Sequence, residues 1–303
     1  MEQAGYMEKK TASLEEERAE LIRRLSTDNT VIGLMKEYGI PAEELSRHPY
    51  RIQRWVQDRK VCISCQSLKQ CRRPRKGYMA GLSYDGLLQD TEEACRYETE
   101  RRNAEKHLEN YLICDLSEEM RRVNFQQISV HEESGAYLSA MKHAMDCCMS
   151  GRGLYLYGSM GTGKTYLAAC AANYYAMQGK KTAFVHYPSL CQRVEAQIRT
   201  GEYKTETDRM GYADFLVIDD IGAEDVTERN RNILLSVLDT RMQNRRPTWF
   251  TSNNDFTSLQ QHFSNTSRGE DLMAAMRIME RIRALAETEK ITGKDRRNLS
   301  QTL

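Results

Sequence analysis

Residues 158–165, Gly-Ser-Met-Gly-Thr-Gly-Lys-Thr, constrain the fold of this chain more than any other stretch. They match the pattern Gly-x-x-x-x-Gly-Lys-[Ser/Thr] in full, between an apolar strand pattern at 153–158 and a helical pattern at 165–179. In such a loop the glycines let backbone N–H groups face phosphate oxygens, and the following helix points its N-terminus toward the anion. The sequence therefore predicts a nucleotide site in a strand–loop–helix unit.

All eight residues of this loop are candidate nucleotide-binding residues. Lys164 is expected to reach the outer phosphates, and the Thr165 hydroxyl is expected to ligate Mg²⁺. The complete predicted loop is Gly158, Ser159, Met160, Gly161, Thr162, Gly163, Lys164 and Thr165.

Strand and helix patterns alternate through the C-terminal part of the chain. Strands are expected at 181–187, 213–222 and 247–253, and helices at 134–149, 190–201 and 230–244. Strands that alternate with helices form a parallel sheet covered on both faces. The predicted fold class is α/β.

Acidic and amide side chains at the ends of two predicted strands complete the site. The run Phe-Leu-Val-Ile-Asp-Asp ends on Asp219, which is expected to hold Mg²⁺, and on Asp220, a candidate for polarising the attacking water. Glu224, four residues further on, is a second candidate base. Asn253 ends a later strand and could hydrogen-bond the water or the γ-phosphate, although, taken alone, a turn-forming role would be preferred for it.

Three cysteines within ten residues open a second motif. Cys62 and Cys65 form C-x₂-C, Cys71 follows six residues later, and Cys95 lies farther along. Four thiolates suit tetrahedral Zn²⁺, and no histidine lies between residues 49 and 106. We predict a structural zinc site with these four ligands, with Cys114 as the alternative fourth ligand. A small, highly charged module needs such a source of folding energy.

Composition divides the chain into two expected domains. Residues 1–116 form a mostly helical, zinc-binding domain, in which residues 91–112 are expected to be helical, and residues 117–303 form the nucleotide-binding domain. The whole chain has 44 basic and 43 acidic side chains, so net charge does not indicate a nucleic-acid partner. The first 20 residues are charged and lack the apolar segment of a signal peptide, and no run of about 18 apolar residues occurs. A cytoplasmic protein without a membrane partner is expected, with its nine cysteines reduced or metal-bound.

Two groups of basic residues are candidates for contact with DNA, although a solvated loop is the simpler interpretation of the first group. A region after the phosphate loop offers the second group, which could contact single-stranded DNA. The first group is Lys69, Arg72, Arg73, Arg75 and Lys76, and the second is Lys180, Lys181, Arg193, Arg199 and Lys204. The six histidines show no ligand spacing.

The order and spacing of these motifs resemble the AAA+ P-loop ATPases. The stretches VIDDIGAE (217–224), TSN (251–253) and RIMERIRALAE (277–287) are similar to bacterial replicative-helicase loaders of the DnaI/DnaC type, and the cysteine cluster resembles the DnaI branch. The resemblance implies that Arg281 is an arginine finger and that Arg297, or alternatively Arg296, is the sensor 2 arginine. Asp-Asp replaces the Asp-Glu of many relatives, and the segment after Asn253 is too short for a full helical lid.

The resemblance also implies a function. It indicates an ATPase that hydrolyses ATP slowly, as a switch, and loads the replicative DNA helicase onto single-stranded DNA during initiation or restart of replication. The implied cofactors are ATP, Mg²⁺ and Zn²⁺, and the implied partners are a hexameric helicase, single-stranded DNA and further copies of the chain. Two alternatives are a transposition ATPase of the IstB type and a zinc-containing DNA-binding scaffold with an inactive nucleotide site.

Overall fold

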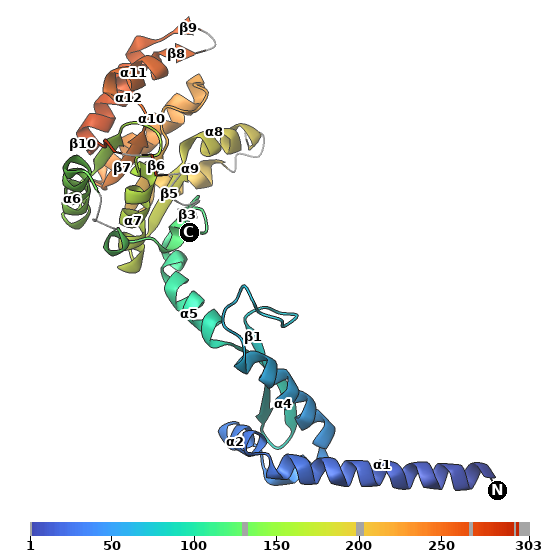
Figure 1. Cartoon of the computed structure of the whole chain (residues 1–303). Coiled ribbons are helices and arrows are strands. Elements are labelled where there is room, and N and C mark those ends of the chain that lie inside the picture. The colour runs from blue at the N-terminus through green and yellow to red at the C-terminus, as the bar shows by residue number, and fades with distance from the viewer. Residues whose placement is uncertain (1, 129–132, 198–202, 267–268, 294, 297–303) are drawn as a thin grey trace. The chain divides into compact units, whose positions relative to one another are not determined.

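A computed structural model of the chain separates into two compact units, Met1–Asn103 and Ala104–Leu303 (Figure 1). The boundary falls earlier than the predicted one at residue 116, because residues 111–114 form a strand in the sheet of the second unit. The structure describes residues 2–128, 133–197, 203–266, 269–293 and 295–296.

The first unit is mostly helical, with one β-hairpin. Among the residues that the structure describes, no helix combines the length and the apolar character needed to cross a bilayer. In chain order its elements are α1 (Glu2–Thr27), α2 (Asn29–Glu37), α3 (Ala42–Arg47), α4 (Pro49–Ile63), β1 (Tyr78–Tyr84), β2 (Leu88–Ala94) and most of α5 (Arg96–Glu105).

One hydrophobic core joins the helices of the first unit to its hairpin. Apolar residues at helical spacing, such as Ile52 and Trp55 of α4, turn one face of each helix inward. Leu82 of β1 and Leu88 of β2 pack into the same core. Trp55 also donates a hydrogen bond from Nε1 to the Ala80 carbonyl oxygen at 3.1 Å, which fixes α4 to β1.

The hairpin corrects one sequence expectation. Residues 91–112 were expected to be helical, but residues 91–94 belong to β2, which pairs antiparallel with β1. The helix α5 covers only Arg96–Glu105. The helical propensity of the Glu-Glu-Ala part of this segment is only a weak local preference. Pairing with β1 overrides it, because that pairing carries the buried Leu88 into the core.

The second unit is built around a six-stranded sheet. In chain order its elements are η1 (Lys106–Asn110), β3 (Tyr111–Cys114), η2 (Met120–Arg122), η3 (Phe125–Gln127), α6 (Gly135–Met149), β4 (Leu154–Tyr157), α7 (Lys164–Met177), β5 (Thr182–His186), α8 (Tyr187–Ala196), α9 (Tyr203–Tyr212), β6 (Phe215–Asp219), α10 (Glu228–Gln243), β7 (Thr248–Ser252), α11 (Phe256–Ser264), β8 (Asn265–Thr266), β9 (Gly269–Glu270), α12 (Leu272–Leu285) and β10 (Glu287–Lys290).

The sheet has the order β10-β4-β7-β6-β5-β3, and its neighbouring strands are parallel. The four strands predicted from the sequence are β4, β5, β6 and β7, so the α/β prediction is confirmed. The edge strands β3 and β10 were not predicted. Helix α9 was also missed, since the sequence indicated only the helix before it.

Helices cover both faces of this sheet (Figure 1). In β6, Leu216 and Ile218 pack into a core shared with α8 to α12, whereas Phe215 and Val217 pack into a second core shared with α6 and α7. A strand that is buried on both faces appears in the sequence as a continuous apolar run. Because β4, β6 and β7 are parallel neighbours, their carboxyl ends bring three predicted motifs to one edge of the sheet.

Arg241 of α10 is fully buried and serves the fold rather than the site. Its Nε donates to the Thr248 hydroxyl at 2.6 Å, and its terminal nitrogens donate to the carbonyl oxygens of Met210, Ala213 and Pro247 at 2.7 to 2.9 Å. Burial lowers the pKa of Arg241 to about 9. One side chain thus links α10, the end of α9 and the start of β7.

Candidate active site

The predicted phosphate loop joins β4 to α7 as expected. Gly158 has φ +146 and Gly161 has φ +76, conformations that favour glycine. A side chain at Gly158 would also lie 2.1 Å from the Ile291 carbonyl oxygen, and one at Gly161 would lie 1.9 Å from the Asp295 carboxylate. The loop therefore needs glycine both for its conformation and for its contact with the segment that follows β10.

Lys164 is the first residue of α7, and its side chain is buried. The ammonium group donates hydrogen bonds to the carbonyl oxygens of Gly158 and Ser159 at 2.9 and 2.8 Å. It also donates to Oδ1 of Asn253 at 2.9 Å. The loop lysine and the strand-end asparagine, 89 residues apart in sequence, are in direct contact.

Asp219 ends β6 and is buried beside the loop. It accepts a hydrogen bond from the Thr251 hydroxyl at 2.6 Å. Burial raises the pKa of Asp219, and hydrogen bonds from Thr251 and Thr165 oppose that rise. The two predicted magnesium ligands, Asp219 and Thr165, therefore lie side by side, and a carboxylate with a hydroxyl is an oxygen set that suits Mg²⁺.

Asp220 adopts φ +59, a left-handed conformation that is uncommon for a residue with a side chain. Its backbone N–H donates to the Thr251 hydroxyl oxygen at 2.9 Å, and its Oδ1 accepts from Nδ2 of Asn253 at 3.4 Å. Nε2 of His186 lies 4.0 Å from the other carboxylate oxygen. The backbone turn therefore places the Asp220 carboxylate within reach of Asn253 and His186.

Glu224, the alternative base, is held elsewhere. Its side chain is buried, and its Oε2 accepts the backbone N–H of Gly222 at 2.8 Å. Its other oxygen lies 3.1 Å from Nε2 of His262 on α11. The two carboxylate oxygens of Glu224 are therefore occupied by Gly222 and His262. Asp220, in contrast, is the acid that contacts Asn253.

Sequence reasoning missed Thr251, the residue that connects the two aspartates. Its hydroxyl donates to Asp219 and accepts from the backbone of Asp220. It lies on β7 two residues before Asn253, and side chains alternate along a strand, so Thr251 and Asn253 share one side. That two-residue spacing is the signal in the sequence that could have indicated Thr251. It is weak evidence until β6, the neighbouring strand that carries Asp219, is known to lie beside β7.

The two predicted arginines have different positions. Arg281 lies on α12, where its Nε donates to Asp239 of α10 at 3.0 Å and a terminal nitrogen donates to Glu280 at 2.8 Å. The partner carboxylates raise the pKa of Arg281, Asp239 contributing most. Both partners belong to helices rather than to the phosphate loop.

Arg297 lies outside the described residues, but its alternative, Arg296, is described and meets the phosphate loop. The backbone N–H of Arg296 donates to the Gly161 carbonyl oxygen at 3.0 Å. Its guanidinium stacks 3.7 Å from the centre of the Tyr137 ring and donates to Glu133 at 2.5 Å. Tyr137 and Glu133, from the start of α6 and the residues before it, were not expected near the site.

The four predicted zinc ligands converge within the first unit. The backbone N–H of Cys95 donates to the Gly77 carbonyl oxygen at 2.8 Å, and the Tyr97 hydroxyl donates to the carbonyl oxygen of Cys65 at 3.1 Å. Cys62 lies in the last turn of α4, three residues before Cys65. These contacts bring both ends of the hairpin to the end of α4.

The thiols also influence one another. Burial raises the pKa of Cys62, Arg73 opposes that rise, and Cys71, Cys65 and Cys95 raise it further. Ligand atoms of three side chains within 4.8 Å of one another occur, among the described residues, at His143, Cys147 and Glu287 and not at these cysteines. The four cysteines thus share one neighbourhood, but no three of their sulfur atoms all lie within 4.8 Å of one another.

Cys114, the alternative fourth ligand, belongs to the other unit. It lies at the end of β3 and packs against the core formed by α6 and α7. Burial raises the pKa of its thiol. Cys95 is therefore the fourth cysteine within the unit that carries the other three.

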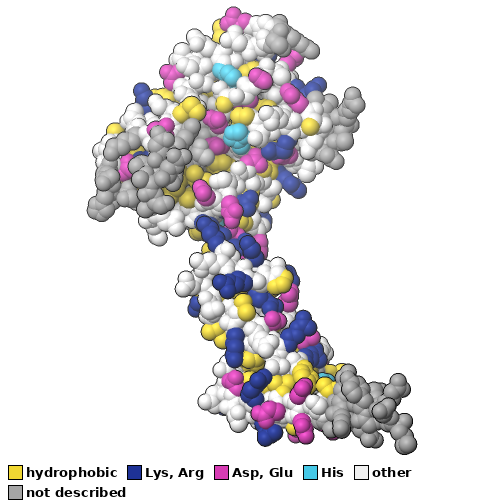
Figure 2. Space-filling view, turned by 45° about the vertical axis from the view of Figure 1, so that its right-hand side comes forward, with side chains coloured by type: hydrophobic (Ala, Val, Ile, Leu, Met, Phe, Trp, Pro, Cys, Tyr) yellow, Lys and Arg dark blue, Asp and Glu magenta, His cyan; other side chains and the backbone are white. Residues whose placement is uncertain are grey.

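Several of the candidate DNA-binding residues are neutralised internally. Arg73 pairs with Asp58 at 3.0 Å, and Arg75 pairs with Glu92 at 2.8 Å. On the face shown in Figure 2, basic and acidic side chains are interspersed.

In the second basic group, Arg193 pairs with Asp115 at 3.0 Å and with Glu206 at 2.6 Å, and Lys181 donates to Asn110 at 3.3 Å. Arg199 lies outside the described residues. The pairing of Arg193 reduces the charge that this group offers to a phosphate backbone.

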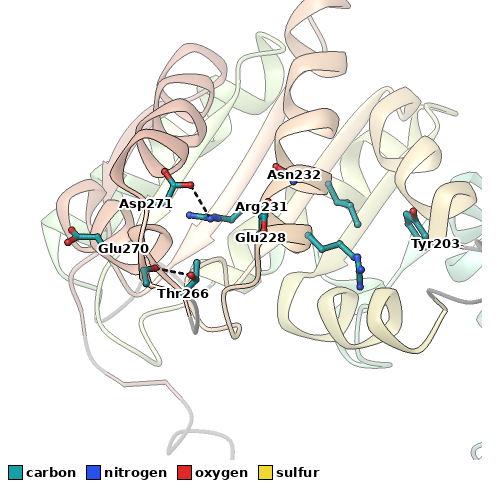
Figure 3. Close-up of a pocket in the computed structure, with 10 residues that line it drawn as sticks. Tyr203, Glu228, Arg231, Asn232, Thr266, Glu270 and Asp271 are labelled. Atoms are coloured by element: carbon teal, nitrogen blue, oxygen red, sulfur yellow. Dashed lines mark hydrogen bonds and ion pairs between the residues drawn. The ribbon is translucent and has the colours of Figure 1, made fainter.

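A pocket of about 760 Å³ lies apart from these motifs, between the start of α9, the first turns of α10 and the β8–β9 hairpin (Figure 3). Arg231 extends along its wall and pairs with Asp271 at 3.3 Å. Its described lining mixes both charges: Tyr203, Glu228, Arg229, Arg231, Asn232, Ile233, Thr266, Gly269, Glu270 and Asp271. The phosphate loop and its two aspartates do not contribute to it.

Comparison with known proteins agrees with the phosphate-loop geometry. The model of the IstB-like ATP binding protein family matches residues 82–302. The chain belongs to this family. The replicative helicase loader DnaI of Bacillus subtilis (strain 168) is 27% identical over 286 residues, which cover 91% of each chain.

Two solved structures support the same fold. A crystal structure of DnaI is 30% identical, with a TM-score of 0.54 over 63% of this chain and 100% of that one. A putative primosome component from Streptococcus pyogenes serotype M3 is 29% identical, with a TM-score of 0.51 over 63% of this chain and 97% of that one. The IstB-like protein is thus similar in sequence and fold to the helicase loader DnaI and to a putative primosome component.

Proposed function

We propose that this IstB-like protein is an ATP-dependent loader that places the replicative DNA helicase on single-stranded DNA during initiation or restart of replication, in the cytoplasm. One observation carries the proposal. The family model begins at residue 82, whereas the similarity to the helicase loader DnaI extends over 286 residues and so includes most of the first unit. Similarity that spans the adaptor as well as the ATPase favours the loader function.

The catalytic part of the proposal assigns one role to each residue of the site. ATP with Mg²⁺ supplies the phosphoryl chemistry. Lys164 and the loop amides hold the phosphates, and Thr165 with Asp219 holds the metal. Asp220 polarises the attacking water, and Asn253 positions it. The contacts among Lys164, Asn253 and Asp220 support this division, because they link the phosphate contact to the base.

Slow, switch-like hydrolysis follows from the base. Asp220 is one methylene shorter than the glutamate found in many AAA+ enzymes, and its carboxylate is anchored by a strained backbone and by Asn253. A short, anchored base reaches the water less easily than a longer one does. Such an enzyme suits a change of state for each loading event better than processive movement.

Arg281 is proposed as an arginine finger that acts on the ATP of a neighbouring subunit. Its partners, Asp239 and Glu280, lie partly exposed on helices, so exchange of one carboxylate for a phosphate is feasible at an interface. Arg296, which contacts Gly161, or Arg297 would act from within the chain as the sensor 2 arginine. The proposal therefore includes self-association through the second unit.

The first unit is proposed as the zinc-stabilised adaptor that binds the hexameric helicase. Cys62, Cys65, Cys71 and Cys95 would hold Zn²⁺, which would supply folding energy to a unit with a single small core. The convergence of the hairpin ends and α4 supports this ligand set. Single-stranded DNA would bind the second unit, where Lys180 and Lys204 remain candidates for contact.

A transposition ATPase is the second candidate, because the family description refers to IstB-like proteins. A direct assay separates the two. The full chain is mixed with the replicative helicase of its host, ATP and a single-stranded DNA circle, and helicase retained on the circle is measured after gel filtration. We expect ATP-dependent retention, which Lys164→Ala abolishes and Lys142→Ala, a matched change at an exposed lysine of α6, preserves.

Two results would contradict the loader function. One is helicase retention that does not depend on this chain. The other is stimulation of a transposase by a chain that leaves helicase retention unchanged, which would favour the second candidate. An inactive scaffold predicts ATP binding without turnover, with or without single-stranded DNA.

A further inference from the structure

A second cluster of metal-binding side chains lies in the second unit, where α6 faces the edge strand β10. His143 and Cys147 are one helical turn apart on α6, and Glu287 opens β10. Nε2 of His143 lies 3.0 Å from Oε2 of Glu287, and Sγ of Cys147 lies 3.9 Å from the same oxygen. The three ligand atoms lie within 4.8 Å of one another. These separations match those between neighbouring ligands of one tetrahedral ion with bonds of about 2.0 to 2.3 Å.

Neighbouring groups orient two of these side chains. Nδ1 of His143 lies 2.6 Å from Oε2 of Glu289, so that carboxylate fixes the ring and directs Nε2 toward Glu287 and Cys147. A histidine held in this way by a carboxylate is the usual outer arrangement of a metal-bound imidazole. Arg152 pairs with Oε1 of Glu287 at 2.5 Å, which leaves Oε2 directed at the cluster.

We propose that His143, Cys147 and Glu287 bind one divalent transition-metal ion, for which Zn²⁺ is the best match. One thiolate, one imidazole and one carboxylate form a ligand set that Zn²⁺ accepts readily and that Mg²⁺ and Ca²⁺, which prefer oxygen ligands alone, do not. The Cys147 side chain is buried, whereas those of His143 and Glu287 remain 29% and 45% exposed. The fourth position would therefore face solvent and accept water.

The groups around the cluster suit a cation. The carboxylates of Glu287 and Glu289 face the imidazole of His143, and Arg152 pairs with Glu287. Zn²⁺ binds cysteine as the thiolate and histidine as the neutral imidazole, so binding would release any proton that occupies either ligand atom.

The position of the cluster gives the metal a structural consequence. It would join α6 to β10, a four-residue strand at the edge of the sheet. The chain continues from β10 through Ile291, whose carbonyl oxygen adjoins Gly158, to Arg296, whose backbone contacts Gly161. A metal at this point would fix β10, the strand that precedes the residues in contact with the phosphate loop. The inference does not depend on the loader function.

Metal counting on the full chain tests the proposal. Protein stripped of metal and refilled with Zn²⁺ is measured by native mass spectrometry, and refilling with Co²⁺ adds a thiolate-to-cobalt absorption band as a second readout. Four variants are compared with the wild type: Cys147→Ala, His143→Gln, Glu289→Gln and, as the matched control, Cys148→Ala, which alters the adjacent buried cysteine of the same helix. Circular dichroism confirms that each variant is folded.

We expect Cys147→Ala and His143→Gln each to lose one metal equivalent per chain relative to the wild type, and Cys148→Ala to lose none. Glu289→Gln should retain the ion with affinity lowered about 10- to 100-fold, as is typical when the partner of a metal-bound histidine is changed. Any zinc at the proposed site of the first unit is common to all variants, so the difference reports on α6 and β10 alone. Equal metal content in folded wild type and Cys147→Ala, or equal losses in Cys147→Ala and Cys148→Ala, would overturn the proposal.

Discussion

The two units of this chain differ in what holds them together. The second unit buries both faces of a parallel sheet beneath two separate cores. Among the described residues, the first unit has one small core, formed by helices and one hairpin, and its surface carries several ion pairs. Exposed ion pairs contribute little to stability. The comparison indicates that the second unit is stable through its own packing, whereas the first unit needs an additional source of stability. We propose that this source is bound zinc.

Removing the metal should affect the two units most unequally. Structural zinc sites contribute about 10–16 kcal/mol to folding at pH 7. We expect Cys95→Ser to lose one zinc and to unfold the first unit, while the second unit still binds ATP. Cys114→Ser, which alters the alternative ligand in the second unit, should keep that zinc. Native mass spectrometry and limited proteolysis measure the two effects, and a Cys95→Ser protein with an intact, metal-free first unit would remove the distinction between the units.

The function of the second unit should depend on residues from two subunits. An arginine supplied in trans is worth roughly 10³–10⁵ in the rate of phosphoryl transfer. We expect Arg281→Ala to bind ATP normally and to hydrolyse it about 10³-fold or more slowly. Loss of the Asp239 ion pair alone would not produce this effect, since an exposed pair contributes little to stability.

A mixing experiment separates action in trans from action within the chain. Lys164→Ala and Arg281→Ala should each be nearly inactive alone, but an interface between them could combine the intact phosphate loop of one subunit with the intact arginine of the other. ATPase activity measured with single-stranded DNA should recover in part, in proportion to the mixed interfaces. Lack of recovery in a demonstrated mixed assembly would show that Arg281 does not act across the interface.

The sequence predicted those parts of the molecule whose chemistry is local. The phosphate loop, β4 and α7 follow from one continuous motif, and Asp219 follows from an apolar strand that ends in acid. Asn253 was weaker from sequence alone, because its position beside Lys164 depends on β7 lying next to β4. The roles of these residues remain predictions.

Contacts between distant segments could not be predicted in this way. Strand β10 has the sequence Glu-Thr-Glu-Lys, which lacks a strand pattern, and it forms by pairing with β4. The approach of Tyr137 to Arg296 and of His143 to Glu289 joins segments about 150 residues apart, and no local pattern encodes them. The hairpin was missed for the same reason, since burial of Leu82 and Leu88 decides it.

The stability of the second unit should depend strongly on Arg241. Replacing it with alanine removes the donors to Thr248 and to several backbone carbonyl oxygens in a buried site, and each unsatisfied buried group costs about 1–3 kcal/mol. We expect Arg241→Ala to lower the free energy of unfolding by at least about 3 kcal/mol in urea. The matched control Arg229→Ala, at an exposed position of the same helix, should change it by less than about 0.5 kcal/mol. A similarly small change in the free energy of unfolding for both variants would show that Arg241 contributes little to the stability of the second unit.

The smallest expected effect concerns a carboxylate of the first unit. Glu98 of α5 is buried and accepts hydrogen bonds from Arg101 at 2.8 and 2.9 Å and from Arg102 at 3.0 Å. The bonds from Arg101, followed by those from Arg102, lower the pKa of Glu98 to about 2 from 4.5. Because the folded-state pKa lies below the unfolded value, the stabilisation is fully present above pH 4.5 and is lost as the pH falls from 4.5 toward 2.

Glu98→Gln should therefore destabilise the first unit at pH 7 by about 1 kcal/mol, a modest value because both arginines are partly exposed. The difference from the wild type should shrink as the pH falls from 4.5 toward 2, since the carboxyl takes up a proton in the unfolded chain near pH 4.5 but in the folded chain only near pH 2. Urea unfolding of the full chain, followed in the first unit through Trp55, measures this difference.

Loss of zinc in acid would act on both proteins and would cancel in the comparison. Glu100→Gln, at an exposed position of the same helix, should show no such pH dependence. If the loss of stability in Glu98→Gln persists unchanged to pH 3, the shape of the side chain, and not its charge, stabilises the helix. The first unit would then depend on packing more than the comparison with the second unit implies.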